Sequence, residues 1–549
     1  MKPTCRLLLF TLILFTFRNE SAFAQQEYYD RAMKAYEQKD FKQSATVLDL
    51  FIKAKKQNLG SNELYNSACI YAMAGESTKA FELLERLAAQ FLMSNAARLE
   101  ADSDLSALRQ TDRWKKLIAQ VNENKRSEPA RTARTIRNAL ARAKTILKKD
   151  NGAMWGTPLW SSHLLILDTK NKIYSAQPLE DAVFQDSLWS RTLPDRTLNQ
   201  SNAPQDFAGS RYAVVMTTYL ADSSATLIHE LFHLAQEKQV QLNGNPLNYL
   251  DGYQARELLR LEYHALREAL SLARKNAPKN DMAAQLSDAV CFRKLRRALS
   301  PETADAEIDI ESSEGLANYT GFRLSDRRDK FALAIKEING RESAPTYTRT
   351  FPYATGPAYG LLFDQLGIEW RSGLNKRYNL GGIFEIRYLH NEVATDSAAF
   401  HAAANRHDYN RIHKEELDRK AIFDQKTAWF TKTLVDAPVL HARLSTDTYS
   451  RSFDMNGTFV LQDKGTVYTA IRGTDITGKN FGSFQTTNTG TADQPAGILG
   501  SPDNREFIFP LPLRTEGSKL TGPNYELLLN PGWVVKPKGD KGNLEIVKQ

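Results

Sequence analysis

The chain has 549 residues, 42% hydrophobic and 25% charged, which is an ordinary globular composition but too long for one compact core, so we expect two or three domains. Its three cysteines, at positions 5, 69 and 291, are too few and too scattered for a disulfide framework or a cysteine metal site, so histidines and carboxylates must hold any metal. The formal net charge of +8 is only weakly basic, and because no recognition motif accompanies it, we expect no nucleic-acid partner.

The first 24 residues have the pattern of an export signal. Lys2 and Arg6 form a basic start, Leu7 to Phe17 is an 11-residue apolar run, and Ala22-Phe23-Ala24 is a small-x-small cleavage site. The run is too short to cross a bilayer, and no later stretch approaches the roughly 18 to 20 apolar residues of a membrane span. We therefore expect an exported chain beginning at Gln25, periplasmic or extracellular, with no integral membrane segment.

Residues 28–121 are rich in Ala, Leu, Tyr and charged residues, and two stretches within them are alike. The second stretch has Ala68, Tyr71, Gly75, Ala80, Leu84 and Leu87, and 36 residues earlier Ala32, Lys39-Asp40-Phe41, Ser44 and Leu48 repeat much of it. This spacing resembles about two units of the tetratricopeptide repeat, whose period is near 34 residues, although Lys39 stands where a turn glycine is usual. The resemblance implies helical hairpins that could bind a protein partner; an ordinary α-hairpin bundle is the alternative.

Residues 131–149 form a predicted amphipathic helix with basic outer faces. Apolar residues recur on it at helical spacing: Ile136, Leu140, Ala143 and Leu147. Such a helix can contact a membrane or an acidic partner, but a solvated face that covers its own domain is the preferred interpretation.

Strand-like runs occur in two parts of the chain. Leu164–Asp168 and Tyr212–Tyr219 lie between turn-rich segments, long helices then dominate to about residue 433, and short strands follow beyond Ala437. We predict a multidomain α+β fold with N-terminal α-helical repeat hairpins, a central mostly α domain with a small sheet, and a C-terminal all-β module. The predicted boundaries are 1–24 for the signal peptide, 25–125 for the tetratricopeptide-like helical domain, 126–435 for the central domain and 436–549 for the small β-rich domain.

The most informative segment is His229-Glu230-Leu-Phe-His233, on a predicted helix that Asp222, Ser223 or Ser224 can cap. On a helix His229 and His233 stand one turn apart on one face, with about 5 to 6 Å between their Cβ atoms. Two imidazoles so placed can bind one Zn²⁺ at about 2.0 to 2.1 Å each. Glu230 follows the first histidine and can reach a water on the metal, as a general base must.

The sequence around this motif favours a metal site over a chance match. With nine histidines, a His-Glu-x-x-His motif arises by chance on the order of once in a hundred such sequences. The motif is flanked by Leu227, Ile228, Leu231 and Phe232, and imidazoles in an apolar setting need partners. A capped apolar helix after a strand-like run resembles the zinc peptidases of the zincin class. No third histidine follows at the metzincin spacing, so the resemblance implies a glutamate as third ligand.

Several downstream glutamates are candidates for that third ligand. Glu257, Glu262 and Glu268 lie on Tyr253–Arg274, an Arg-rich amphipathic helix on which we expect solvated charges. Glu314 instead opens a Glu-Gly-x-Ala run, whose small residues let one helix approach another closely. This run resembles the third-ligand helix of the gluzincins, especially their aminopeptidase branch, and the resemblance makes Glu314 the third zinc ligand.

Two features qualify the choice of Glu314. Glu311, one turn earlier, is the alternative ligand. The gap of 81 residues from His233 to Glu314 is longer than in the aminopeptidase branch, so an inserted helical pair must lie between them. Asn318, one turn after Glu314, could orient a zinc-bound imidazole.

The segment around Tyr353 resembles another part of the same branch. Tyr353-Ala-Thr-Gly356 matches a Tyr-x-x-Gly helix that brings a tyrosine hydroxyl to the developing oxyanion, an effect of a few kcal/mol. The alternative is a packing aromatic beside a helix contact. The Gly-x-Met-Glu-Asn run that binds a substrate amino terminus in that branch is absent, so aminopeptidase specificity is not implied.

Other patterns give no support to a different chemistry. His401, His407 and His413 are spaced by six residues, which on a helix turns each away from the last, so we expect solvated side chains. The chain has no serine-hydrolase elbow and no phosphate-binding glycine loop.

We therefore predict an exported zinc metallopeptidase, with His229, His233 and Glu314 as metal ligands, Glu230 as general base and Tyr353 at the oxyanion. A peptide or protein is the expected substrate, and the run Ala213–Tyr219 is the expected edge strand that pairs with it. One rival is a helical-repeat interaction protein with an inactive peptidase-like domain. Another is a zinc hydrolase that acts on a non-peptide amide.

Overall fold

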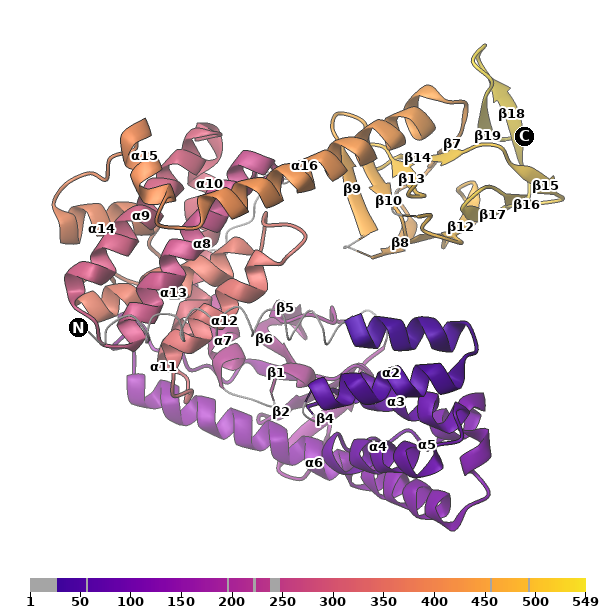
Figure 1. The fold of residues 1–549 in the computed structure, drawn as a ribbon, viewed down its shortest axis with the longest axis horizontal. Helices are drawn as coiled ribbons and strands as arrows, with labels where there is room; N and C mark the ends of the chain where they lie inside the picture. Colours follow the sequence, from indigo (N-terminus) through magenta and orange to yellow (C-terminus); the bar gives the residue numbers. More distant parts are fainter. Residues whose placement is uncertain are drawn as a thin grey trace, which may run out of the picture. The chain divides into compact units, whose positions relative to one another are not determined.

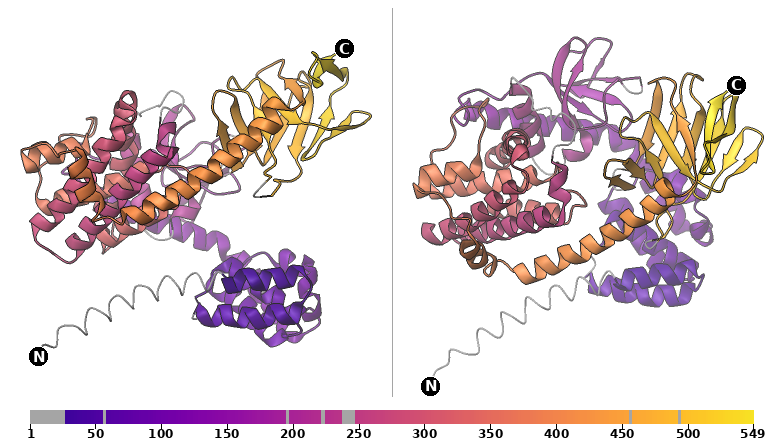
Figure 2. Two further views of the ribbon diagram at one scale, coloured as in Figure 1. Left: turned by 45° about the horizontal axis from the view of Figure 1, so that its top comes forward. Right: turned by 90° about the horizontal axis from the view of Figure 1, so that it is seen from above.

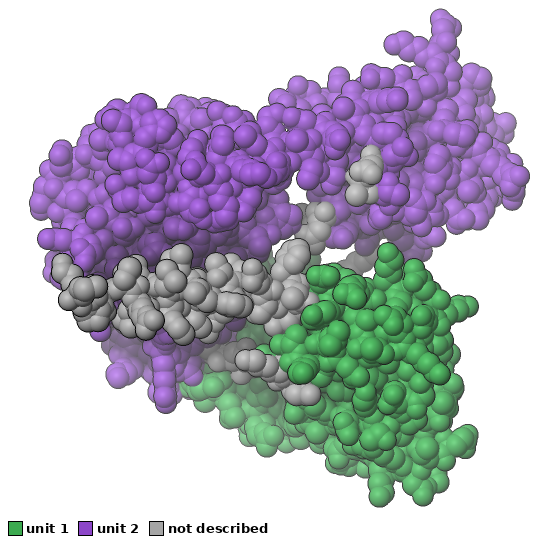
Figure 3. Space-filling view, in the orientation of Figure 1, with its two compact units in different colours: residues 1–142, 162–222 green, residues 143–161, 223–549 purple. Residues whose placement is uncertain are grey.

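The computed structural model describes residues 27–55, 58–194, 197–220, 224–236, 247–454, 457–491 and 494–549. The predicted signal peptide lies outside these residues, as do Asp222 and Ser223. The chain is multidomain α+β with all-β sheets at its C-terminal end, as the sequence predicts in outline (Figure 1). It forms two compact units, one of residues 1–142 and 162–222 and one of residues 143–161 and 223–549 (Figure 3).

The first unit begins with short helices around one apolar core. Residues 27–37 are helical, and the following elements are α2 (Phe41–Ala54), α3 (Ser61–Met73), α4 (Ser77–Gln90), α5 (Ala96–Ala101) and the 3-10 helix η1 (Ser103–Leu108). Lys39 and Gly75, which occupy equivalent places in the two similar stretches, both have positive φ, 62° and 84°. The same left-handed turn therefore occurs at both places, although only Gly75 adopts it without steric cost.

The long helix α6 (Asp112–Asp150) contains the predicted basic helix. Its apolar positions Ile136, Leu140, Ala143 and Leu147 are all buried, whereas Arg134 is exposed. The apolar stripe therefore covers protein, which agrees with the preferred interpretation of a solvated basic face.

Six strands follow in the first unit: β1 (Leu164–Leu167), β2 (Lys172–Ser175), β3 (Val183–Gln185), β4 (Leu188–Thr192), β5 (Ala203–Phe207) and β6 (Ser210–Met216). They form one sheet in the order β3-β4-β2-β1-β6-β5, with β1 and β6 parallel. The prediction that Ala213–Tyr219 is an edge strand is wrong. β6 is flanked by β1 and β5, and Thr217–Tyr219 leave the sheet as the 3-10 helix η2.

The second unit begins with a helical body. Its elements are α7 (Ala225–Ala235), η3 (Asn248–Asp251), α8 (Tyr253–Arg274), α9 (Lys279–Ala298), η4 (Pro301–Thr303), α10 (Ala304–Ile310), the π-helical turn η5 (Glu311–Gly315), α11 (Leu316–Leu324), α12 (Lys330–Glu342), α13 (Phe351–Leu366), α14 (Leu380–Phe384), η6 (Glu385–Leu389), α15 (Ser397–Ala404), α16 (Tyr409–Thr431) and η7 (Lys432–Asp436). α8 and α9 pack along each other and lie in the chain between α7 and η5, where the sequence predicts an inserted helical pair.

Glycines set the close helix packing within this body. A Cβ on Gly321 of α11 would lie 2.7 Å from the carbonyl oxygen of Ala225 at the start of α7. A Cβ on Gly356 of α13 would lie 2.3 Å from the carbonyl oxygen of Gly315. Both distances are shorter than any real Cβ contact, so only glycine permits α11 and η5 to approach α7 and α13 this closely.

The C-terminal strands form two sheets (Figure 2). One has the order β18-β19-β7-β14-β13-β10-β9 and the other the order β15-β16-β17-β12-β11-β8. Their bounds are β7 (Val439–Arg443), β8 (Tyr449–Phe453), β9 (Thr458–Leu461), β10 (Gly465–Tyr468), β11 (Ile471–Asp475), β12 (Gly482–Thr486), β13 (Ile498–Gly500), β14 (Glu506–Pro510), β15 (Arg514–Glu516), β16 (Lys519–Thr521), β17 (Tyr525–Leu529), β18 (Trp533–Lys538) and β19 (Asn543–Lys548). The ring of Phe484 in β12 contacts Phe507 and Phe509 in β14, so the sheets share one core.

No helix in the described part of the chain combines the length and the apolar character that crossing a bilayer requires.

Candidate metal centre

The two motif histidines lie on α7, which is held in place by its apolar side chains. Leu227, Ile228, Leu231 and Phe232 are completely buried. Ser224 stands at the N-cap position but does not cap the helix, because its Oγ is 3.2 Å from Asp326 Oδ1 instead. Burial of the surrounding apolar residues therefore fixes this helix and the direction of its histidines.

Three side chains converge within the helical body: His229, His233 and Glu314. The two Nε2 atoms are 3.1 Å apart, and Glu314 Oε2 lies 3.5 Å from His229 Nε2 and 3.3 Å from His233 Nε2. Tetrahedral ligands about 2.0 to 2.1 Å from a zinc ion are separated by about 3.3 to 3.4 Å. The triangle of ligand atoms therefore has the dimensions of one face of a zinc coordination tetrahedron.

Glu314 reaches the histidines because η5 packs tightly on its other side. Gly315 packs against α13, where its carbonyl oxygen faces Gly356. Gly321, six residues further on, packs against α7. The sequence predicts that small residues after Glu314 permit a close helix approach. In the structure the close contacts are made with two different helices: Gly315 packs against α13, and Gly321 packs against α7.

Glu311, the alternative ligand, is directed elsewhere. Arg293 holds both of its oxygens, with Nη1 2.8 Å from Oε2 and Nη2 2.7 Å from Oε1, and the hydroxyl of Thr355 also donates to Oε1. The Glu311 side chain is completely buried, whereas 30% of the Glu314 side chain is exposed. Three of its roughly four lone-pair sites are therefore occupied by Arg293 and Thr355, and the carboxylate pairs with that arginine.

The expectation of solvated glutamates on α8 is wrong for two of the three. Glu262 is completely buried and accepts from Arg293 and Arg296, and Glu257 is buried beside His413. Only Glu268 is exposed. The Arg-rich pattern that indicates a surface helix instead reflects ion pairs inside the protein.

Glu230 is buried next to the cluster without a full set of partners. Its Oε1 lies 4.0 Å from His229 Nε2, and its Oε2 is buried with no hydrogen bond within the described residues. Burial raises the pKa of this carboxyl, and the neighbouring histidines counteract part of the shift. A carboxylate with a raised pKa and an unpartnered oxygen is suited to take up a proton at this place.

Tyr353 also belongs to the site. Its hydroxyl donates to Glu314 Oε2 over 2.6 Å, and its ring stacks on His229 with centroids 5.9 Å apart. Burial and the charge of Glu314 raise the pKa of this phenol, so it stays protonated and can donate. Asn318 does not orient an imidazole as predicted; its Nδ2 donates to the Tyr353 carbonyl over 2.7 Å and so holds the backbone of the tyrosine.

The charges of the cluster favour a cation at its centre. Burial alone would raise the pKa of Glu314, but hydrogen bonds from both histidines outweigh it and hold this pKa well below the usual range. Burial alone would lower the pKa of His233, but the hydrogen bond and charge of Glu314 raise it. The chemistry of the donor set, two imidazoles and one carboxylate, fits Zn²⁺.

One neighbour of the cluster was not predicted from the sequence. Gln236, at the end of α7, has its Oε1 3.2 Å from His233 Nδ1. The only sequence signal is the spacing of three residues after His233, which places the amide beside the ring on a helical turn.

Other titratable groups lie close together but are satisfied by protein partners. The ligand atoms of Cys69, Asp102 and Asp104 lie close together, but Tyr65 donates to Asp102 over 2.6 Å and Tyr36 donates to Asp104. Both carboxylates therefore accept hydrogen bonds from tyrosine hydroxyls, so we interpret this group as a structural contact and not as a metal site.

The prediction of three solvated histidines is wrong for His407. This side chain is completely buried, with Nε2 2.8 Å from Asp288 Oδ2 and Nδ1 3.2 Å from His264 Nδ1. Its partners lie on α9 and α8. The spacing of six residues between the three histidines cannot predict contacts with other helices.

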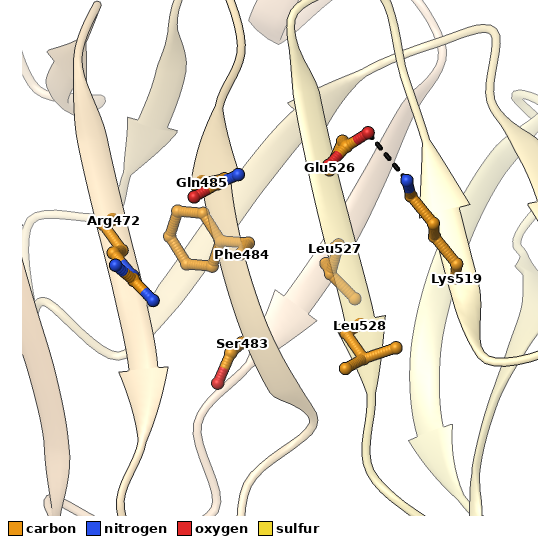
Figure 4. A pocket seen from close by; sticks show the side chains of 8 residues that line it. All are labelled: Arg472, Ser483, Phe484, Gln485, Lys519, Glu526, Leu527 and Leu528. Carbon is orange, nitrogen blue, oxygen red and sulfur yellow. Dashed lines mark ion pairs between the residues drawn. The ribbon is translucent and has the colours of Figure 1, made fainter. Parts of the chain in front are cut away.

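A hollow on the C-terminal sheets is separate from these residues. Its lining comes from β11, β12, β16 and β17, and Lys519 and Glu526 form an ion pair across part of it (Figure 4). None of the predicted site residues lies in it.

In comparisons with known protein families, curated proteins and solved structures, nothing matches this chain. Function is therefore inferred from the side chains of the site and their geometry.

Proposed function

We propose that this chain is an exported zinc-dependent peptidase of gluzincin type. The observation that carries the proposal is the triangle of ligand atoms from His229, His233 and Glu314, with sides of 3.1, 3.3 and 3.5 Å. The signal-like residues 1–24 support export. Tetratricopeptide-like hairpins and a zincin-like central domain are the finer fold assignment that goes with this proposal.

Each side chain of the site has a definite role in peptide hydrolysis. Zn²⁺ held by these three ligands would lower the pKa of a water bound to it to about 7 and would polarise the scissile carbonyl. Glu230 accepts the proton of the attacking water on its unpartnered Oε2 and delivers it to the leaving amine. Tyr353, whose hydroxyl now donates to Glu314, transfers that hydrogen bond to the developing oxyanion.

The first experiment measures metal content and activity on residues 25–549. Elemental mass spectrometry is expected to find about one zinc per chain, and digestion of a peptide library to yield new amino termini. Glu230→Gln is expected to keep the zinc and lose about 10² to 10⁴-fold in activity, because it removes the proton acceptor and leaves all three ligands. Glu268→Gln is the matched control, since Glu268 is exposed on α8.

The outcomes separate the proposal from its rivals. Activity of Glu230→Gln equal to that of the parent chain would contradict the role of Glu230. A chain that neither contains nor rebinds zinc would contradict the metal site and favour an interaction protein. A chain that binds zinc and hydrolyses other amides, but no peptide bond, would assign the site to a non-peptide substrate. Product analysis by mass spectrometry would identify that substrate.

A further inference from the structure

The side chain of Gln236 contacts both chain segments that form the metal centre. Its Oε1 lies 3.2 Å from His233 Nδ1, at the end of the helix that carries both histidines. Its Nε2 lies 3.5 Å from the carbonyl oxygen of Ser312, and Ser313 Oγ lies 3.5 Å from Oε1. Ser312 and Ser313 immediately precede Glu314 in η5. One amide thus joins the histidine helix to the turn that carries the glutamate.

The direction of the first contact determines which nitrogen of His233 carries a proton. Nε2 of His233 faces the cluster, 3.1 Å from His229 Nε2 and 3.3 Å from Glu314 Oε2. Nε2 can bind a metal only through its lone pair, so a neutral ring must carry its proton on Nδ1. The amide oxygen of Gln236 can only accept, and it therefore stabilises the Nδ1–H form.

The backbone holds Gln236 in this place. Its N–H donates to the carbonyl oxygen of Phe232 over 3.1 Å, as in a helix, and its φ and ψ of −70° and 123° take the chain out of the helix. The side chain therefore starts from a fixed position beside His233. Gln236 is only partly buried, so replacing it removes no part of the apolar core.

We propose that Gln236 is a positioning residue for the metal centre: it holds His233 in the Nδ1–H form. This inference rests on the proposed zinc function. Outer hydrogen bonds of this kind orient a ligand ring and raise its basicity, and their loss typically costs about 10- to 100-fold in metal affinity.

The test is zinc affinity, measured by competition with a chromophoric chelator on residues 25–549. Gln236→Leu keeps the side-chain volume but loses the acceptor, and we expect it to weaken zinc binding by about 10- to 100-fold. Gln236→Glu keeps an acceptor at the same reach and is expected to restore affinity to within a few-fold of the parent. Gln285→Leu is the matched control, since Gln285 is a partly buried glutamine on another helix, α9.

Two further measurements separate positioning from a loss of folding. The thermal midpoint of the zinc-free protein is expected to be the same for the parent chain, Gln236→Leu and Gln236→Glu. Gln236→Asn retains a polar amide but is one methylene shorter, so its oxygen should no longer reach His233 Nδ1. It should therefore weaken zinc binding as much as Gln236→Leu does. The absorption bands of Co²⁺-loaded protein should shift in Gln236→Leu and return in Gln236→Glu, because they report ligand geometry.

The inference and the proposed function fail in different ways. If the parent chain binds zinc and Gln236→Leu binds it equally well, the positioning role is wrong and the peptidase proposal stands. The role is also wrong if Gln236→Glu is as weak as Gln236→Leu. If the parent chain binds no zinc, the proposed function itself is wrong.

Discussion

Two groups of charged side chains lie in the helical body, and they differ in how their hydrogen-bonding capacity is used. We call His229, His233 and Glu314 the ligand cluster, and Glu262, Arg293, Arg296, Glu307 and Glu311 the arginine–glutamate network. In the network every carboxylate accepts from at least one guanidinium, and all five side chains are completely or almost completely buried. In the ligand cluster, three lone-pair donors face one another and part of Glu314 is exposed.

The difference separates a structural ion-pair network from a site. Buried charges are stable only when paired and hydrogen-bonded, and the network meets that condition with its own side chains. The ligand cluster consists of two imidazoles and one carboxylate, the donor set that suits Zn²⁺, so a bound cation would complete it. Glu311 and Glu314 show the contrast most directly, because they are three residues apart in one π-helical turn and belong to different groups.

Removing Glu314 gives the largest expected effect. Glu314→Ala takes away one of three protein ligands, so zinc affinity should fall by about 1,000-fold or more. Metal titration with a competing chelator measures it, and the thermal midpoint of the zinc-free variant should stay within a few degrees of the parent. Zinc binding unchanged in this variant would remove Glu314 from the site. Glu268→Ala, on the exposed face of α8, is the matched control.

Removing Glu311 should lower the stability of the fold and leave metal binding unchanged. Glu311→Ala leaves the buried Arg293 without its bidentate partner, and the free energy of unfolding should fall by about 3 to 5 kcal/mol. Urea unfolding followed by circular dichroism measures this change, with Glu268→Ala expected within about 0.5 kcal/mol of the parent. A Glu311→Ala variant that unfolds like the parent but loses zinc would reverse the assignment of the two glutamates.

The Tyr353 hydroxyl connects the ligand cluster to the proposed reaction, because it donates to Glu314. Tyr353→Phe should keep the zinc and lower kcat by about 100-fold, because only the donor to the oxyanion is lost. Steady-state kinetics on a peptide found by library digestion measures it, and Tyr219→Phe, an exposed tyrosine, is the control. If kcat does not change, Tyr353 is a packing aromatic, which is the alternative that its sequence leaves open.

Acid should weaken the network through Glu307. Burial alone would raise the pKa of Glu307, but Arg296 and Arg297 outweigh it and lower this pKa to about 2. Its contribution to stability is therefore complete above the unfolded-state pKa of about 4.3 and is lost as the pH falls toward 2. Between pH 6 and pH 3 the parent chain should lose about 2 kcal/mol more than Glu307→Gln in urea unfolding. An equal loss of unfolding free energy in the parent chain and in Glu307→Gln would contradict this role of the Glu307 carboxylate.

The local features of the site follow from short-range periodicity. A helix places residues i and i+4 on one face whatever surrounds it, so the pairing of His229 with His233 and the place of Glu230 could be predicted from spacing alone. Strand-like apolar runs likewise predict β1 and β6, and the all-β character of the C-terminal region.

Long-range contacts could not be predicted in this way. Nothing in the local sequence of β6 indicates that β5 pairs with it and removes the expected edge. The buried partners of Glu262 and His407 come from other helices, and a charged residue on an amphipathic helix gives no sign of an arginine across an interface. Gln236 also contacts Ser312 and Ser313, which are more than 70 residues away in the chain.

The sequence by itself determined the helix that carries His229, Glu230 and His233, because helical spacing and a flanking apolar run are properties of a few consecutive residues. Only the tertiary structure decided which of Glu311 and Glu314 faces that helix. The two have the same chemistry and neighbouring positions, and the choice depends on Arg293, brought up by α9, which pairs with Glu311 and leaves Glu314 to the histidines. A sequence pattern cannot encode that choice, because the burial of a charge depends on which opposite charge the fold places against it.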